Sequence, residues 1–461
     1  MKKAPSPGAW KSTPAFCRLF ALMLASQACT VAFDLQAQSI WNASTGLWSS
    51  DGNWQPNSVP ISSSVTSLSF GGGTGYTTTN DLGTFTLSQL AFTNSAGTIV
   101  LDSQPTTHAL QVVNSANAML PKISLEGTGS ATVAAPINWD ANARVLNAGS
   151  GTLLFNGAQN YANGTKQTFI NSGTGVLTLA DGLTYASAGS NTGLVLNVIN
   201  QNSAANSFNI GDLGSLNNLT LRVGGAGTVR FAGSAGDLFS GSGNLQVLGG
   251  ATFDFNGNAE SMGAIFGEGT IRLSGAAGVT MAAVGQYLFS GKLTGNGSVT
   301  VGATSHTLEL SGSTSDYTGV TSVTAGRLII SANATSGSTG ALGSTTSEIL
   351  VGGTSGSSPA ALLIGAENVI VGRNVRLQSG NTGTVTLGAL NSSGVSTFSG
   401  NITMGTNSAA AKGLTIFSTS GGTLALDGNL LRATAATGTT DALTLNGGGE
   451  VVLRGSNTFT G

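Results

Sequence analysis

Residues 297–333 alternate apolar and polar side chains in short runs, and a dipeptide containing glycine separates each run from the next. Val299 and Val301 make one apolar pair, and Leu308 and Leu310 make another. Alternation with period two is typical of half-buried strands, and glycine tolerates the backbone angles of tight turns. Strands this short are not stable alone, so the chain has to stack them. The other apolar pairs of the stretch are Val320 with Val323 and Leu328 with Ile330.

Similar units recur along the chain. Residues 450–461 align with residues 307–319, because both begin with an alternating strand that ends at a glycine. In that alignment Val451 falls on Leu308, Leu453 on Leu310, Gly455 on Gly312, Phe459 on Tyr317 and Gly461 on Gly319. Looser units occupy 151–157, 175–182, 227–233, 251–274 and 422–428. Self-similarity over about 20–25 residues predicts an all-β solenoid, a single elongated domain of stacked repeats.

The repeat also carries a family resemblance. Residues 308–330, LELSGSTSDYTGVTSVTAGRLII, resemble the passenger-associated transport repeat of bacterial autotransporters, in which a TLTLSG strand, an N-T-Y-T-G corner and a T-x-V-x-A-G-T-L strand follow one another. The matching residues are Leu308, Leu310, Gly312, Tyr317, Thr318, Gly319, Thr321, Val323, Ala325, Gly326 and Leu328. Ser315 and Asp316 depart from the usual Asn-Thr. The resemblance is specific over 297–333 and 447–461 and looser over 150–450. It implies a right-handed parallel β-helix outside a cell with a Gram-negative-type envelope.

Composition excludes two classes of protein. The 461 residues include 69 Gly, only 8% are charged, and the formal net charge is −2. Intrinsic disorder goes with low hydrophobicity or high net charge, whereas 40% of this chain is hydrophobic. A nucleic-acid-binding protein needs a basic face, so nucleic acid is not expected as a partner.

Residues 1–37 have the pattern of an export signal. Four basic residues precede an apolar core that begins at 19–25, and small residues follow it. We expect cleavage after Ala37, with cleavage after Ala28 or lipoprotein processing at Cys29 as alternatives. The other cysteine, Cys17, also precedes that cut, so the mature chain would contain no thiol. The remaining sequence contains no stretch long and apolar enough to predict a membrane span.

Residues 38–64 are rich in tryptophan, with Trp41, Trp48 and Trp54. Large rings can cover the open end of a solenoid and its unpaired strand edge, so we interpret this segment as an N-terminal cap. The alternative is a platform on which sugar rings stack. We assign 65–461 to the repeats. Because 447–461 stops inside a repeat, we expect the repeats to continue into a C-terminal barrel or sorting segment.

The sequence does not predict a catalytic, cofactor-binding or metal-binding residue. His108 and His306 have no partner Cys or His nearby, and His306 is expected at a corner. Residues 211–215, GDLGS, resemble a protease nucleophile motif, but Leu213 stands where the serine would be. Residues 224–229, GGAGTV, lack the Asp of a calcium-binding nonapeptide.

Carboxylates are scattered, and their densest group is Asp254, Glu260 and Glu268, with Arg272 close behind. A β-helix lyase or hydrolase needs clustered carboxylates for Ca²⁺ or for acid–base catalysis. We interpret this group as a set of surface corners and expect no enzymatic activity.

Three functions remain open. The first is a structural and adhesive protein, secreted or displayed at the cell surface, that presents Ser, Thr and Asn to polysaccharide, matrix or other cells. The second is a β-helix that binds or cleaves polysaccharide. The third is a repeat region that supports export while another part of the protein carries the function.

Overall fold

The computed structural model describes residues 38–461 apart from short internal segments and the last three residues. Residues 1–37 are outside the described residues, and so is the predicted signal peptide. The other omitted residues are 116–118, 163, 181–182, 185–192, 214–217, 234–237, 240, 276–277, 379, 406–412, 433–441 and 459–461, and for 183–184 only the backbone is described.

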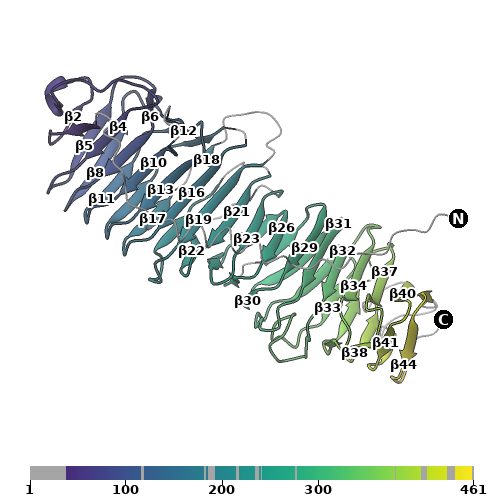
Figure 1. Cartoon of the computed structure of the whole chain (residues 1–461). Helices are drawn as coiled ribbons and strands as arrows, with labels where there is room; N and C mark the ends of the chain where they lie inside the picture. Colours follow the sequence, from purple (N-terminus) through teal and green to yellow (C-terminus); the bar gives the residue numbers. More distant parts are fainter. Residues whose placement is uncertain are drawn as a thin grey trace. The chain divides into compact units, whose positions relative to one another are not determined.

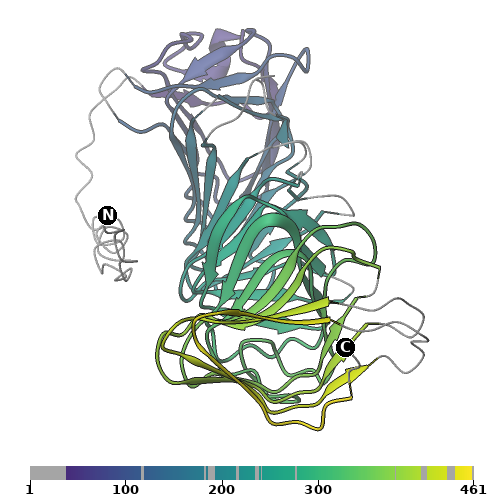
Figure 2. The same cartoon turned by 90° about the vertical axis from the view of Figure 1, so that its right-hand side faces the viewer.

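The described chain winds through about 15 turns of a parallel β-solenoid, with strands on three faces, A, B and C (Figures 1 and 2). This confirms the predicted all-β fold of stacked repeats. Face A contains β1 (Gln38–Trp41), β4 (Ser67–Phe70), β7 (Gln89–Phe92), β10 (Lys122–Leu125), β13 (Ala143–Asn147), β16 (Lys166–Asn171), β19 (Val195–Asn200), β21 (Thr220–Gly224), β23 (Asn244–Val247), β26 (Ala264–Gly267), β29 (Gly285–Phe289), β34 (Ala360–Ile364), β37 (Val385–Ala389), β40 (Gly413–Ser418) and β43 (Ala442–Gly447).

Face B follows face A in each turn. It contains β2 (Gly46–Leu47), β5 (Tyr76–Asn80), β8 (Thr98–Ser103), β11 (Ser130–Val133), β14 (Thr152–Phe155), β17 (Val176–Leu179), β20 (Phe208–Ile210), β22 (Thr228–Phe231), β24 (Thr252–Asp254), β27 (Thr270–Leu273) and β30 (Lys292–Gly295). A second sheet takes the same place in the later turns, with β35 (Ile370–Val371), β38 (Val395–Phe398), β41 (Thr423–Leu426) and β44 (Glu450–Leu453).

Face C completes the turn. It contains β6 (Phe85–Leu87), β9 (Leu110–Val112), β12 (Ile137–Trp139), β15 (Gln159–Tyr161) and β18 (Leu183–Thr184), and later β25 (Glu260–Met262), β28 (Gly278–Met281), β33 (Ile349–Val351), β36 (Val375–Leu377), β39 (Ile402–Met404) and β42 (Leu430–Arg432). Two longer strands, β31 (Ser298–Leu310) and β32 (Thr321–Ile330), run from face C onto face A without a break, since β31 pairs with both β28 and β29.

The core is a set of columns, because register-paired residues of successive turns point the same way. One column on face A contains Ile123, Val145, Phe169, Val198 and Val223, all of them buried. Each buried aliphatic or aromatic side chain contributes about 1.5–3 kcal/mol relative to exposure. The alternation seen in the sequence is therefore the inside–outside alternation of each strand.

The repeat at 297–333 agrees with the expectation at one point and differs from it at another. The turn expected at Ala325–Gly326 is a bend within β32, where the strand passes from face C to face A and Gly326 has a φ of +79°. Val320 is exposed, and Thr321 takes the inward position before Val323. The inward-facing residue is polar here because its hydroxyl has a buried partner, the hydroxyl of Tyr317 at 2.8 Å.

The two repeat windows also lie on different faces. Leu308 is on face A, paired with Leu328, whereas Val451 is on face B, paired with Leu424. The aligned windows are thus not equivalent positions of the stack. The right-handed winding implied by the family resemblance remains a prediction.

The first strand of face A has neighbours on both edges. β4 pairs with one edge in parallel, and β3 (Trp54–Gln55) pairs with the other in the antiparallel direction, opposite Ile40 and Trp41. A short 3-10 helix, η2 (Asp51–Asn53), precedes β3. Among the described residues no helical segment has the length and apolar character needed to cross a bilayer.

Candidate functional site

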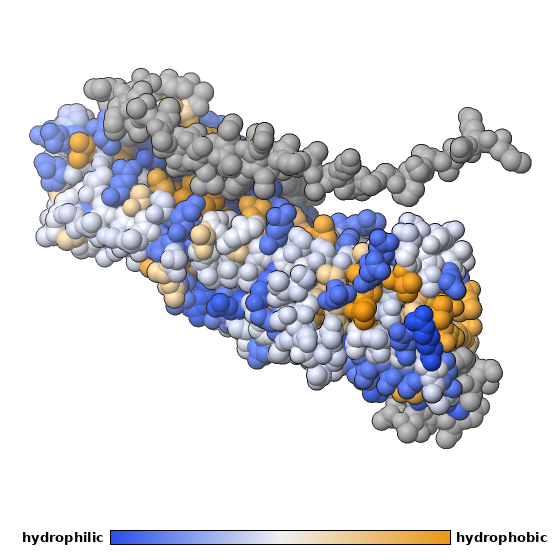
Figure 3. Space-filling view, turned by 60° about the horizontal axis from the view of Figure 1, so that its bottom comes forward, coloured by the Kyte–Doolittle hydropathy of each residue, from blue (hydrophilic) through white to orange (hydrophobic). Residues whose placement is uncertain are grey.

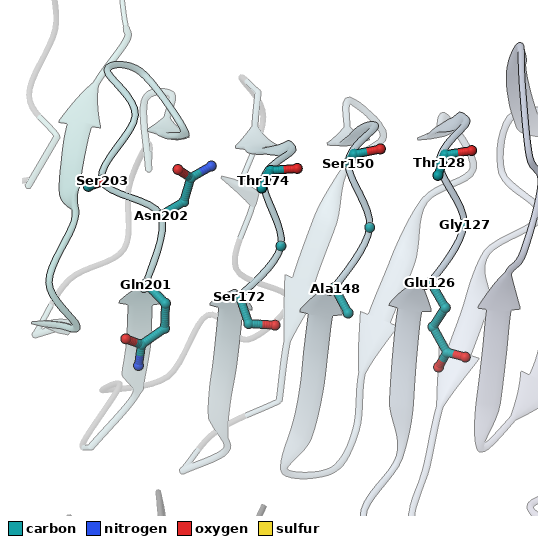
Figure 4. Close-up of a pocket in the computed structure, with 12 residues that line it drawn as sticks. Glu126, Gly127, Thr128, Ala148, Ser150, Ser172, Thr174, Gln201, Asn202 and Ser203 are labelled. Carbon is teal, nitrogen blue, oxygen red and sulfur yellow. The ribbon is translucent and has the colours of Figure 1, made fainter.

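A shallow groove of about 470 Å³ runs across four successive turns at the corner between face A and face B. Each of the first three corners is a tripeptide with a central glycine, and the fourth replaces the glycine with Asn202. Figure 4 shows these corners side by side, each following a strand of face A. The tripeptides are Glu126–Thr128, Ala148–Ser150, Ser172–Thr174 and Gln201–Ser203.

The central glycines form the floor of the groove because the stacked backbone leaves no room for a side chain. A Cβ on Gly149 would lie 2.0 Å from the carbonyl oxygen of Gly127, and one on Gly173 would lie 2.0 Å from that of Gly149. The flanking residues stay exposed and form two rims. Their side chains follow one another at the strand spacing of about 4.8 Å.

The rims carry mostly hydroxyl and amide groups. The Thr128 hydroxyl donates to the Ser95 carbonyl oxygen at 2.5 Å. Within the part of the chain that the structure describes, Ser150, Ser172 and Thr174 make no side-chain hydrogen bond. They are therefore available to a polar ligand, although the described residues that line the groove include no aromatic ring.

One carboxylate, that of Glu126, lies on the groove. Its Oε1 atom is 2.8 Å from Lys122 Nζ and accepts a hydrogen bond from Ser124 Oγ at 3.0 Å. Partial burial alone would raise the pKa of Glu126, but the Lys122 ammonium and the Ser124 hydroxyl outweigh it and hold the pKa below its usual value. The carboxylate is therefore ionised at neutral pH and paired.

Cations recur on face A beside the groove. Lys122 is in register with Arg144 on the next turn, and the same column continues through Thr168 and Asn197 to Arg222. Arg222 Nε donates to Gln246 Oε1 at 2.6 Å. Lys166, exposed at the start of β16, adds a further cation on this face.

The tryptophans of 38–64 are not a sugar-stacking platform. Trp41, Trp48 and Trp54 are at most 4% exposed and pack against one another and against Phe70. Trp48 Nε1 donates a hydrogen bond to Thr78 Oγ1 at 2.7 Å. The Asp81 carboxylate accepts hydrogen bonds from the amide and the hydroxyl of Ser49. Since the rings face the core, a pyranose cannot reach them.

Neither His108 nor His306 lines the groove. His108 Nδ1 accepts a hydrogen bond from the Gly83 amide at 3.1 Å. His306 lies where β31 bends from face C onto face A, so the predicted corner is a bend within a continuous strand. Its side chain is fully buried, with Nδ1 2.7 Å from the Ala283 carbonyl oxygen and its ring stacked on Tyr287. The described residues contain no group of three His, Cys, Asp or Glu placed to bind a metal.

The densest carboxylates of the sequence are separated in space. Asp254 lies in β24 on face B, Glu260 in β25 on face C, and Glu268 between β26 and β27. The expectation of surface corners is wrong for the first two, which are 9% and 3% exposed. Arg272 pairs with Asp254 at 3.6 Å. In GDLGS, Leu213 is buried in the core, while Gly214 and Ser215 are outside the described residues.

Only 8% of the residues are charged, and hydropathy varies over the visible face (Figure 3) without one dominant patch. Figure 3 shows a face that is pale over large areas, with blue and orange patches scattered over it. The groove was not predicted from the sequence, although the recurrence of Gly127, Gly149 and Gly173 before Ser or Thr was a usable signal. No protein-family model, curated protein or solved structure matches the chain.

Proposed function

We propose that this protein is a structural and adhesive β-solenoid, secreted or displayed at a cell surface, that performs no catalysis. The observation that supports it most is the hydrogen-bonded parallel stack from β1 to β43. Each turn holds its neighbours by backbone hydrogen bonds and a shared core, so the stack resists bending and gives a firm support for outward side chains.

The repeat pattern supports the cellular location that we propose for the protein. Residues 297–333 and 447–461 resemble repeats of autotransporter passengers, and 1–37 resemble an export signal. We propose export by a Sec-type route and exposure outside a Gram-negative-type envelope. Partners in that setting would be polysaccharide, matrix or other cells.

Binding of polysaccharide is the second candidate, and the corner groove favours it. An open groove with hydroxyl and amide rims over four turns suits a sugar chain laid along the stack. Binding is preferred to cleavage, because glycoside hydrolysis uses two carboxylates. Among the described residues that line the groove, Glu126 alone carries a carboxylate, and it is already paired with Lys122.

The test uses source cells with and without the intact gene. Antibodies against 38–461 should label intact cells that carry the gene, and these cells should attach to polysaccharide-coated surfaces more than the deletion strain. Labelling without any difference in attachment would favour a region that only supports export. Labelling that requires cell lysis would contradict surface display.

A further inference from the structure

The first turn of the groove shows how an anion is held at its rim. Lys122 lies on face A, and its ammonium reaches Glu126 at 2.8 Å, at the start of the corner. A long cationic side chain in this column therefore spans the distance from face A to the groove.

On the next turn the cation is repeated and the anion is missing. Arg144 is in register with Lys122, and Asn147 is in register with Leu125. Ala148, which follows Asn147, therefore corresponds to Glu126, which follows Leu125. Ala148 is exposed and carries only a methyl group. Within the described residues, Arg144 has no carboxylate within ion-pair distance. The place that the Glu126 carboxylate occupies on one turn is thus open beside a cation on the next.

The surroundings favour an acidic sugar polymer over a nucleic acid. Three of the four floor positions are glycine, and the rims carry mostly hydroxyls and amides, which match the hydroxyls of a sugar chain. The further cations, Lys166 and Arg222, lie on separate turns of face A and do not form a dense basic cluster. A nucleic acid carries a charge on each nucleotide and is bound by a strongly basic face, whereas this chain has a net charge of −2.

We propose that the groove binds an acidic polysaccharide, with one carboxylate or sulfate group over Ala148, paired with Arg144. This rests on the proposed adhesive function and names its ligand class. The bound group occupies, one turn later, the position that Glu126 occupies beside Lys122.

The test measures binding of the full chain to immobilised polygalacturonate and dextran sulfate, with methyl-esterified pectin and neutral dextran as uncharged counterparts. Ala148→Glu supplies the missing carboxylate internally, and Ala148→Gln is its neutral match of equal size. Arg144→Gln removes the cation. Arg327→Gln removes an exposed cation of β32, away from the groove, and is the charge-matched control.

We expect the wild type to bind at least one acidic polymer in a salt-sensitive way. Ala148→Glu and Arg144→Gln should weaken this binding about fivefold, the effect of one exposed ion pair. Ala148→Gln and Arg327→Gln should bind as the wild type does. Glu126→Gln should bind more tightly, because it frees Lys122.

Three results would overturn the inference. The first is that the wild type binds neither acidic polymer. The second is that Arg327→Gln weakens binding as much as Arg144→Gln. The third is that single-stranded DNA binds equally well and with the same dependence on Arg144. If the protein is retained on the neutral polymers and Arg144→Gln has no effect, the proposed adhesive function is supported. The proposed site for an acidic group is then wrong.

Discussion

At the scale of single residues, the buried polar side chains of His306 and Arg373 lie outside the groove, and substituting them tests the described packing of the core. His306 is fully buried, its Nδ1 is 2.7 Å from the Ala283 carbonyl oxygen, and its Nε2 has no hydrogen-bond partner among the described residues. Protonation would place an unsatisfied donor in the core. Burial accordingly lowers the pKa of His306, and the hydrogen bond to Ala283 offsets this only in part.

The free energy of unfolding should therefore decrease as the pH falls. Because the pKa of His306 is lower in the folded chain than its usual value of 6.5, the unfolded chain binds more protons below about that pH. The contribution is complete above pH 6.5 and is lost as the pH falls towards the folded pKa. The free energy of unfolding is expected to decrease over this range, because protonation leaves one buried donor unpaired. Urea unfolding at several pH values measures it, and a His306→Gln variant that keeps the same acid sensitivity would contradict the assignment.

Arg373 is a buried cation inside the solenoid. It donates from Nε and Nη2 to the Ser347 carbonyl oxygen at 2.9 and 2.7 Å, and from Nη1 to that of Leu342 at 2.9 Å and to Thr321 Oγ1 at 3.1 Å. Burial lowers the pKa of Arg373, partly offset by Tyr317. The guanidinium thus fastens the segment before β33 to the core.

Arg373→Met keeps most of the volume and removes these donors. The expected cost is about 2–4 kcal/mol, since two carbonyl groups lose buried partners. Hydrogen exchange in peptides covering 340–349 should accelerate before exchange elsewhere. Arg454→Met, at an exposed ion pair with Asp427, should leave exchange unchanged. Equal effects of the two variants would show that Arg373 does not hold this segment.

At the scale of elements, glycine at the corners is required by stacking. A Cβ on Gly149 would lie 2.0 Å from the Gly127 carbonyl oxygen, so Gly149→Ala should cost about 1–3 kcal/mol through overpacking. Gly52→Ala is the matched control, because nothing lies within 4 Å of a Cβ at that position. Urea unfolding compares them. If both variants are equally stable, the corner is looser than described.

Strand positions could be predicted from local pattern, but the groove could not. Leu308 and Leu310 alternate in the sequence and face the core, since alternation directly reports burial. Which corners stand next to one another depends on register, which is a property of the whole stack. The similarity between 307–319 and 450–461 was therefore misleading, because those windows lie on faces A and B. The corner predicted at His306 is a bend within β31, but nothing local in the sequence shows that its side chain is fully buried there.

At the scale of the whole stack, each turn contacts only its neighbours, so damage at one end should remain local. Trp48→Ala removes a fully buried indole from the first turns and its hydrogen bond to Thr78. A cost of about 3–5 kcal/mol is expected. Hydrogen exchange should accelerate in 38–103 and stay unchanged in 360–404. Uniform acceleration along the chain would show a single cooperative unit instead.

The most direct measurement for the account as a whole is binding and turnover in one experiment. The purified full chain is passed over a polysaccharide film while its retained mass and the new reducing ends in the effluent are both recorded. If the protein is an adhesive solenoid, its retention should saturate and the amount of reducing ends should be the same with and without protein. The Glu126→Gln variant should leave the reducing-end signal unchanged. Reducing ends that rise with protein concentration would contradict the account and show an enzyme.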